Sequence, residues 1–100
     1  MLKHIVMWKL KDQAEGADRA ANACEMKRRL DTCAGIVPGM HTFEVTIAQA
    51  GLEATYDVVL YSEFADRAAL EAYIAHPTHQ AVVPFIGAIR EARQCMDYEV

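Results

Sequence analysis

The sequence predicts an α+β fold in which helices cover one face of a single antiparallel sheet. Three segments alternate apolar and polar residues with the period of a strand, and two stretches repeat apolar residues with the period of a helix. Together with a strand-like tail, these segments follow the order βαββαβ, the ferredoxin-like arrangement of a four-stranded antiparallel sheet. A length of 100 residues fits one domain, which we place at residues 1–100.

The three alternating segments are LKHIVMWKL at residues 2–10, HTFEVTI at 41–47 and YDVVLYSEF at 56–64. Alternation places successive side chains on opposite faces of a sheet. One face of the predicted sheet carries Leu2, His4, Val6, Trp8, Leu10, Phe43, Val45, Ile47, Tyr56, Val58, Leu60, Ser62 and Phe64. The opposite face carries Lys3, Ile5, Met7, Lys9, Thr42, Glu44, Thr46, Asp57, Val59, Tyr61 and Glu63.

The first helix is predicted from apolar residues at helical spacing, namely Ala23, Met26, Leu30 and Cys33. Its start has two candidates, because Asp12 and Glu15 have the spacing of a capping box and Asp18 is a second possible N-cap. Gly35 is a natural helix terminator.

The second helix begins after Asp66 and ends before Pro77, because the residue before a proline avoids the helical conformation. Its inward stripe is Leu70, Tyr73 and Ile74. We expect a short helical piece from about Thr78, interrupted by Pro84. The tail at residues 90–100 then forms the fourth strand, and its pattern leaves open which side chains face the helices.

Composition excludes several classes of protein. The net charge is −4 and the only basic cluster is KRR at residues 27–29, so we expect no nucleic-acid partner. No apolar stretch approaches the ~20 residues of a membrane span, and the first ten residues are too short and too rich in lysine for a secretory signal. We therefore expect a cytoplasmic protein without a membrane partner. The cysteines, Cys24, Cys33 and Cys95, are expected to be buried, reduced thiols.

The sheet face opposite the helices carries apolar residues near its middle: Ile5, Met7, Val59 and Tyr61. Left bare, they form an apolar patch of roughly a few hundred Å², which is large for a monomer. A second copy of the same sheet is the simplest cover. We therefore predict a homodimer that joins sheet to sheet through these four residues, with Glu63 at its polar rim.

The segment YIAHPTHQAVVPFI, residues 73–86, carries the candidate chemistry. On an unbroken helix, side chains six residues apart diverge by about 120°. Pro77 breaks the helix, and the bend can bring Tyr73 and His79 into one cavity, where His79 is a candidate base and Tyr73 a candidate oxyanion donor. The alternative interpretation is structural: His79 fastens the helix junction by bonding to backbone, and Tyr73 packs as core with no void beside it.

These segments resemble the stress-responsive A/B barrel domain (Dabb) family over essentially the whole chain. The resemblance is carried by LKHIVMWKLKD, GIVPG, YDVVLYSEFAD, LEAYIAHPTHQAVVPFI and the closing DYEV. It implies a dimeric α/β barrel of two ferredoxin-like protomers. One branch of the family includes the plant polyketide cyclase that closes olivetolic acid, whose Y-x-x-H-P-x-H motif is similar to Tyr73, His76, Pro77 and His79. That resemblance assigns catalytic roles to Tyr73 and His79 and a cavity position to His4. The stretch QAVVPFI departs from the glycine-rich, roomier stretch of the cyclase.

Each protomer is expected to hold its own cavity between sheet and helices, an apolar pocket with a few converging polar groups. Its predicted walls are Val6, Trp8, Leu60, Leu70 and Ile74, with His4, Tyr73 and His79 as the polar groups. The four histidines are scattered over separate elements, so we expect no metal site, and we expect no cofactor.

Three function classes remain. The first is a homodimer that binds a small apolar or aromatic ligand, or serves stress tolerance, without turnover. The second is a cofactor-free cyclase, isomerase or lyase that uses His79 as base and Tyr73 as oxyanion donor. The third is a cofactor-free monooxygenase, which rests on fold analogy alone.

Overall fold

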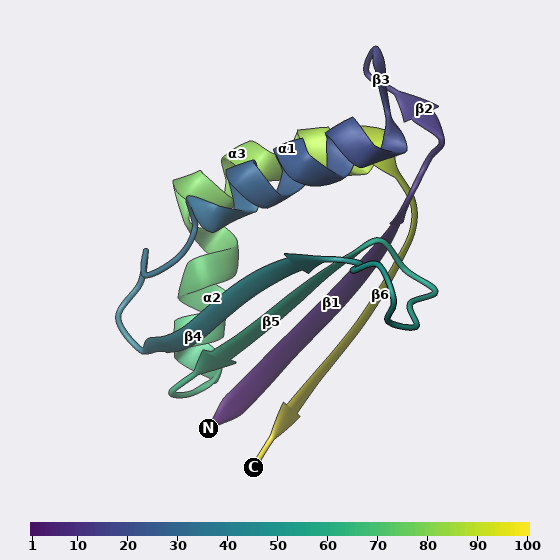
Figure 1. Cartoon of the computed structure of the whole chain (residues 1–100). Helices are drawn as coiled ribbons and strands as arrows, with labels where there is room; N and C mark the ends of the chain where they lie inside the picture. The colour runs from purple at the N-terminus through teal and green to yellow at the C-terminus, as the bar shows by residue number, and fades with distance from the viewer.

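A computed structural model describes residues 1–100. Four long strands form one antiparallel sheet in the order β4-β5-β1-β6: Met40–Ile47, Val58–Phe64, Leu2–Leu10 and Arg90–Glu99. The helices α1 (Arg19–Asp31), α2 (Arg67–Ala75) and α3 (Pro77–Ile89) lie on one face of this sheet and leave the other face bare (Figure 1). The predicted ferredoxin-like βαββαβ fold is confirmed.

The core forms between the helices and the face of the sheet predicted to be apolar. The inward residues of β1 are all buried, whereas Met7 on the opposite face is 38% exposed. In β5 the same alternation buries Leu60 and Phe64. The helices contribute Met26, Leu30, Leu70, Tyr73, Val82, Ile86 and Ile89 to this core, and Cys33 joins it from the turn after α1. The two predicted faces of the sheet are therefore as the alternation indicates.

Of the two predicted starts of α1, the structure has the one at Asp18. A small hairpin of β2 (Gln13–Ala14) and β3 (Ala17–Asp18) precedes the helix. Glu15 lies at its turn with φ 52°, so it takes no part in a capping box. Asp18 is the N-cap, since its carboxylate accepts a hydrogen bond from the Ala21 N–H at 2.8 Å.

The helical segment after Pro77 is longer than expected. The sequence predicts a short piece interrupted by Pro84, but α3 runs continuously for 13 residues with Pro84 inside it. A proline at this position removes one helical hydrogen bond to the carbonyl of Gln80. Gln80 is exposed, so solvent can satisfy that carbonyl, and the apolar contacts of Val82, Ile86 and Ile89 hold the helix against the sheet.

Register settles the facing of the last strand, which the sequence left open. Trp8 pairs with Arg93, Val6 with Cys95 and His4 with Asp97. Cross-strand partners share a face, so Arg93, Cys95 and Asp97 lie on the helix side of the sheet. The expectation of three buried thiols is wrong for two of them: Cys33 is buried, but Cys24 and Cys95 are exposed, and all three are free.

The first and last residues of the chain meet at one end of the sheet (Figure 1). The Val100 N–H donates to the Met1 carbonyl at 3.0 Å, and the Met1 amino group donates back to the Val100 carbonyl at 3.1 Å. No helix is long and apolar enough to cross a membrane.

Candidate functional site

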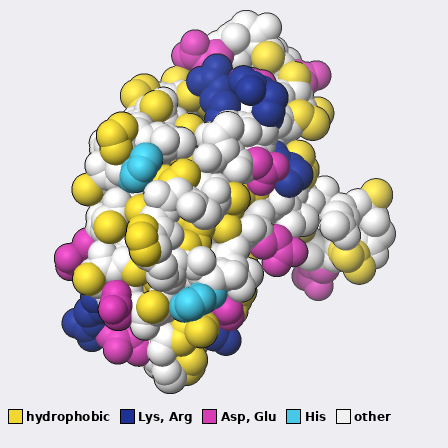
Figure 2. Space-filling view, turned by 90° about the vertical axis from the view of Figure 1, so that its left-hand side faces the viewer, with side chains coloured by type: hydrophobic (Ala, Val, Ile, Leu, Met, Phe, Trp, Pro, Cys, Tyr) yellow, Lys and Arg dark blue, Asp and Glu magenta, His cyan; other side chains and the backbone are white.

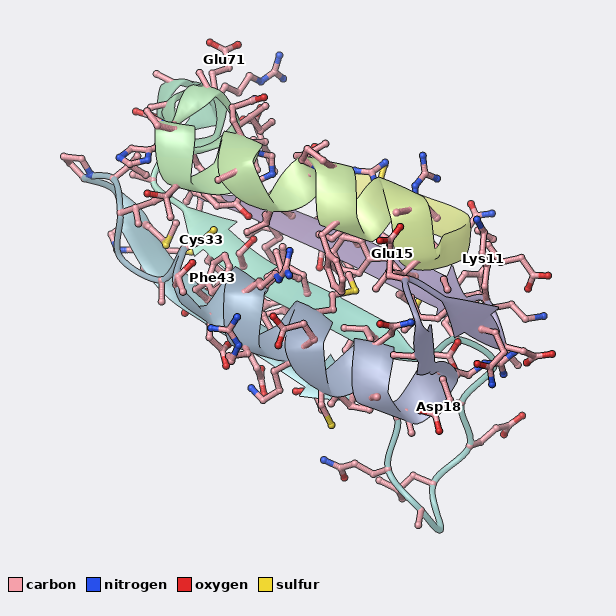
Figure 3. The ribbon with its side chains drawn as sticks, turned by 90° about the horizontal axis from the view of Figure 1, so that it is seen from above. Lys11, Glu15, Asp18, Cys33, Phe43 and Glu71 are labelled. Atoms are coloured by element: carbon pink, nitrogen blue, oxygen red, sulfur yellow. The ribbon has the colours of Figure 1, made fainter.

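A cavity of about 230 Å³ lies between the helices and the sheet. Seen from above, α1 and α3 run side by side across the sheet, and side chains fill the layer between them (Figure 3). The cavity is lined from β1, α1, β5, α2, α3 and β6 by His4, Val6, Trp8, Leu30, Leu60, Tyr73, His79, Val83, Ile86, Gly87, Arg90 and Arg93. Most of its exposed lining residues come from α3 and β6, so its mouth opens between these two elements.

Tyr73 is fully buried, yet its hydroxyl has no hydrogen-bond partner. Its ring is held by aromatic neighbours, with centroid distances of 5.5 Å to Phe64 and 5.9 Å to Phe43. Burial raises the pKa of Tyr73, so the phenol keeps its proton at neutral pH. A buried donor without a partner costs free energy. An oxygen acceptor from a ligand would supply the missing partner.

His79 lies beside Tyr73, with their ring centroids 4.7 Å apart. Its Nδ1 is 2.9 Å from the Ile74 carbonyl oxygen, and because a carbonyl can only accept, Nδ1 carries the proton. Neutral His79 therefore has a free lone pair on Nε2. Burial lowers the pKa of His79. The hydrogen bond to Ile74 raises this pKa, and the charges of His4 and Arg93 lower it further. The imidazole is thus neutral, in the tautomer that can accept a proton.

The third polar group on this side of the cavity is His4. Its Nδ1 is 2.5 Å from an Asp97 carboxylate oxygen, so Nδ1 donates and the ring is oriented by β6. The His4 ring lies 6.4 Å from the Tyr73 ring, centroid to centroid. A central phenol donor with an imidazole on either side is suited to proton transfer next to a carbonyl group.

The junction that positions His79 is built by His76 and Pro77. His76 ends α2 and caps α3, where its Nδ1 accepts from the Thr78 N–H at 3.1 Å. Pro77 occupies the first turn of α3, where its missing N–H costs nothing. The chain therefore bends between Tyr73 and His79, and both side chains reach the same cavity.

Two predicted wall residues lie elsewhere. Val6, Trp8 and Leu60 line the cavity as expected, but Leu70 and Ile74 do not. Leu70 is buried beside a separate hollow near the end of β6, and Ile74 is 42% exposed. The physical reason is that α2 lies at one end of the sheet, whereas α3 runs beside α1 (Figure 1) and supplies the lining residues Val83, Ile86 and Gly87.

The residues that take their place are Leu30, Val83, Ile86, Gly87, Arg90 and Arg93. The helical spacing of Val83, Ile86 and Gly87 could have indicated the α3 contribution. Arg93 shares a face of β6 with Cys95 and Asp97, but only the register of β6 against β1 shows that this face is the one toward the helices. Nothing in the pattern around Arg90 marks it as a lining residue.

The structure contains one observation in favour of each interpretation of residues 73–86. His79 bonds to backbone, as the structural interpretation requires. Tyr73, however, lines the same cavity as His79, which the functional interpretation expects, and its hydroxyl has no hydrogen-bond partner. The bond to the Ile74 carbonyl also fixes the tautomer of His79, so it is compatible with the functional interpretation as well as with the structural one. No group of three or more potential metal ligands lies together.

The bare face of the sheet has a different character. Ile5 pairs with Tyr61 and Met7 with Val59, so the four residues predicted at an interface form one contiguous patch. Met96 of β6 extends it and is 65% exposed. The polar groups here are already paired: the Tyr61 hydroxyl donates to Glu63 at 2.6 Å and the Thr42 hydroxyl to the same carboxylate at 3.1 Å.

The surface near α2 and the start of β4 is mixed in character. Figure 2 shows apolar side chains across the middle of this view and a group of Lys and Arg side chains near its top, over the helical layer. The protein as a whole is acidic, with a net charge of −4.

The model of the Stress responsive A/B Barrel Domain family, Dabb, matches residues 2–100. The chain belongs to the Dabb family. The family predicted from the sequence motifs is thereby confirmed. No protein of curated function matches this Dabb chain.

Solved structures agree with the family in fold. A dimeric protein of unknown function from Bacteroides fragilis, with a ferredoxin-like fold, is 28% identical, with a TM-score of 0.82 over 99% of this chain and 95% of that chain. A dimeric ferredoxin-like protein of unknown function from Jannaschia sp. is also 28% identical, with a TM-score of 0.74 over 99% and 98% of the two chains.

A third solved structure carries the name antibiotic biosynthesis monooxygenase. It is 21% identical, with a TM-score of 0.75 over 100% of this Dabb chain and 98% of that chain. At this identity the likeness shows a common fold alone.

Proposed function

We propose that this Dabb protein is a homodimer that binds a small molecule with an aromatic or other apolar body in the cavity of each protomer. The observation that carries the proposal is Tyr73, a fully buried residue that lines this cavity and whose hydroxyl has no hydrogen-bond partner. Native proteins rarely leave a buried donor unsatisfied, and each exception calls for an explanation. A ligand oxygen is the explanation that also accounts for the apolar walls.

The size of the cavity supports a small ligand. An apolar cavity of ~150 Å³ can hold benzene. About 230 Å³ therefore accommodates one aromatic ring with a short substituent, with Val6 and Leu60 as the apolar floor.

The dimer is supported by the contiguous apolar patch on the bare face of the sheet. Its centre is Ile5, Met7, Val59 and Tyr61, as predicted from the sequence. The relatives from Bacteroides fragilis and Jannaschia are described as dimeric. A symmetric contact of two such sheets should bury well over ~1,000 Å² in total, the size of a stable interface.

A second candidate function is cofactor-free acid–base catalysis, and the tautomer of His79 favours it. In this scheme His79 Nε2 takes a proton from the carbon next to a ligand carbonyl. The electron pair of the broken C–H bond moves onto the carbonyl oxygen, and the Tyr73 O–H donates to that oxyanion. The resemblance of Tyr73, His76, Pro77 and His79 to the cyclase motif supports the same roles.

Binding is tested by the melting temperature of the protein in the presence of small aromatic and polyketide-like compounds. A compound that binds only the folded state raises the melting temperature, by an amount that grows with the logarithm of its concentration relative to its Kd. We expect at least one to do so in the wild type and to lose most of its effect in Tyr73→Phe. If no compound shifts the wild type, or Tyr73→Phe responds equally, the proposed binding site is wrong.

Catalysis is tested by hydrogen exchange on a bound ketone in D2O, followed by proton NMR. We expect the wild type to exchange the proton next to the carbonyl and His79→Gln to bind the ketone without exchanging it. His41→Gln is the matched control, because His41 is exposed and outside the cavity. Binding without exchange in the wild type would leave the binding proposal intact and refute the catalytic one.

A further inference from the structure

The polar groups of the cavity fall at two ends. His4, Val6 and Trp8 point into it from alternate positions of β1. A strand advances ~3.3 Å per residue, so the backbone positions of His4 and Trp8 are separated by ~13 Å. Tyr73 and His79 belong to the His4 end, and the other end is formed by Trp8 with Arg90 and Arg93.

The Trp8 end has a second unpartnered donor. The Trp8 side chain is only 5% exposed, and its indole N–H makes no hydrogen bond. Indole nitrogen can only donate, so an acceptor is required. Arg93 is the cross-strand partner of Trp8 and lies on the same face of the sheet.

The two cavity arginines differ from every other arginine of the protein. The other four each form an ion pair with a carboxylate: Arg19 with Asp12, Arg28 and Arg29 with Glu25, and Arg67 with Glu99. Arg90 and Arg93 form none, and no aspartate or glutamate is among the residues that line the cavity. Two uncompensated positive charges therefore stand at one cavity of an acidic protein.

On the basis of the proposed small-molecule site, we infer that the cavity binds a carboxylic acid, with its carboxylate at Arg90 and Arg93 and its apolar body directed toward the histidines. The planar guanidinium fork matches the two oxygens of a carboxylate. A neutral ligand would satisfy the donors but leave both charges unpaired.

The geometry assigns separate roles to the two ends of such an acid. The carboxylate orients the molecule, because charge-assisted hydrogen bonds are stronger than neutral ones. The far end then meets the Tyr73 hydroxyl and the free lone pair of His79. The arginines thus bind the carboxylate of the ligand, and Tyr73 and His79 act on the opposite end of the same molecule.

The experiment compares acids with their own neutral amides, which have nearly the same volume. The probes are benzoate with benzamide, and 3-phenylpropionate with 3-phenylpropionamide. Trp8 is the only tryptophan of the chain and lines the cavity, so its fluorescence reports binding directly. We expect each acid to bind wild type at least about tenfold more tightly than its amide, and added salt to weaken binding of the acids alone.

The double variant Arg90→Gln/Arg93→Gln should abolish the advantage of the acids, so that each acid and its amide bind with similar affinity. Arg28→Gln is the matched control, because Arg28 is exposed on α1 and its partner Glu25 retains Arg29. Both arginines of the double variant are exposed, so its melting temperature should equal that of the wild type.

Each other outcome is decisive. Equal affinity for acid and amide would overturn the inference and leave the small-molecule site standing. Failure of all four compounds to bind would overturn both. Phenyl phosphate binding about tenfold more tightly than either acid would show that the arginines select a phosphate and not a carboxylate.

Discussion

The two faces of the sheet differ in which side chains are left without a contact. On the bare face the polar groups are paired through Glu63, while apolar side chains such as Met7 and Met96 are exposed. On the helix-covered face the apolar side chains are buried, while the Tyr73 hydroxyl and the Trp8 N–H have no partner. The difference indicates two kinds of missing contact. Both are what the proposed function predicts: an apolar partner surface on the bare face and a small molecule with hydrogen-bond acceptors in the cavity.

The largest effect is expected on the bare face. Val59→Asp places a charge at the centre of the proposed interface, where it has no partner. An uncompensated buried charge costs ~3–5 kcal/mol, so dimerisation should weaken by more than about a hundredfold. Light scattering at micromolar concentration should give the mass of a dimer for the wild type and of a single or unfolded chain for the variant.

The control for this change is Ala68→Asp, which adds the same charge at an exposed position of α2. It should remain dimeric with an unchanged melting temperature. A wild-type protein that is monomeric under these conditions would remove the proposed difference between the faces.

Two tyrosines allow the same atom to be removed from each face. Tyr73→Phe removes an unpartnered buried hydroxyl, so we expect the free energy of unfolding to rise by about 1 kcal/mol. Tyr61→Phe removes a hydroxyl that donates to Glu63, so we expect a fall of about 0.5–1 kcal/mol. Urea denaturation of both variants measures the difference. A fall for Tyr73→Phe would show that its hydroxyl already has a partner in the free protein.

Two substitutions of Gly87 test the stability of α3 and the volume of the cavity separately. A Cβ at this helical position meets no atom within 4 Å, so Gly87→Ala should stabilise the protein by about 0.5–1 kcal/mol. Gly87→Leu should extend into the cavity and abolish ligand binding while the protein remains folded. Calorimetry and Trp8 fluorescence measure the two effects. Unchanged ligand affinity in Gly87→Leu would place the binding site elsewhere.

A smaller effect concerns pH. Burial lowers the pKa of His79 below its ordinary value of 6.5, so the unfolded chain binds a proton more readily than the folded one. The contribution of His79 to stability is therefore fully present above pH 6.5 and is lost as the pH falls below it. Urea midpoints at about pH 5 and pH 7.5 should differ less in His79→Gln than in wild type. An equal difference would mean that His79 is not the group responsible.

The faces of the sheet could be predicted because burial on one side imposes strict alternation, as in LKHIVMWKL. The approach of Tyr73 to His79 could be anticipated because Pro77 must end one helix and can begin another. The stripe of α2 shows that Leu70 and Tyr73 face inward, but it cannot show which part of the sheet the helix covers. For that reason the stripe alone predicts Leu70 and Ile74 in a cavity that α3 lines instead.

The arginines of the cavity were harder to find. β6 lies at the sheet edge and is largely exposed, so its hydrophobic pattern is weak and leaves the facing of Arg93 open. Only the pairing of Arg93 with Trp8 resolves it. The prediction that Pro84 interrupts the helix is wrong for another reason. A proline is costly inside a helix, but packing of the flanking apolar residues outweighs that cost here.

The pairing of β1 with β6 also bears on how the site comes into being during folding. Leu2 pairs with Glu99, so the sheet is completed by contacts between residues almost a full chain length apart. Such contacts raise the contact order, and the loop entropy they require slows folding. An intermediate that lacks β6 would lack Arg93 and the Asp97 that orients His4. Ligand affinity would then belong only to chains that have completed the sheet, and a bound ligand would slow hydrogen exchange in β6 by opposing its detachment.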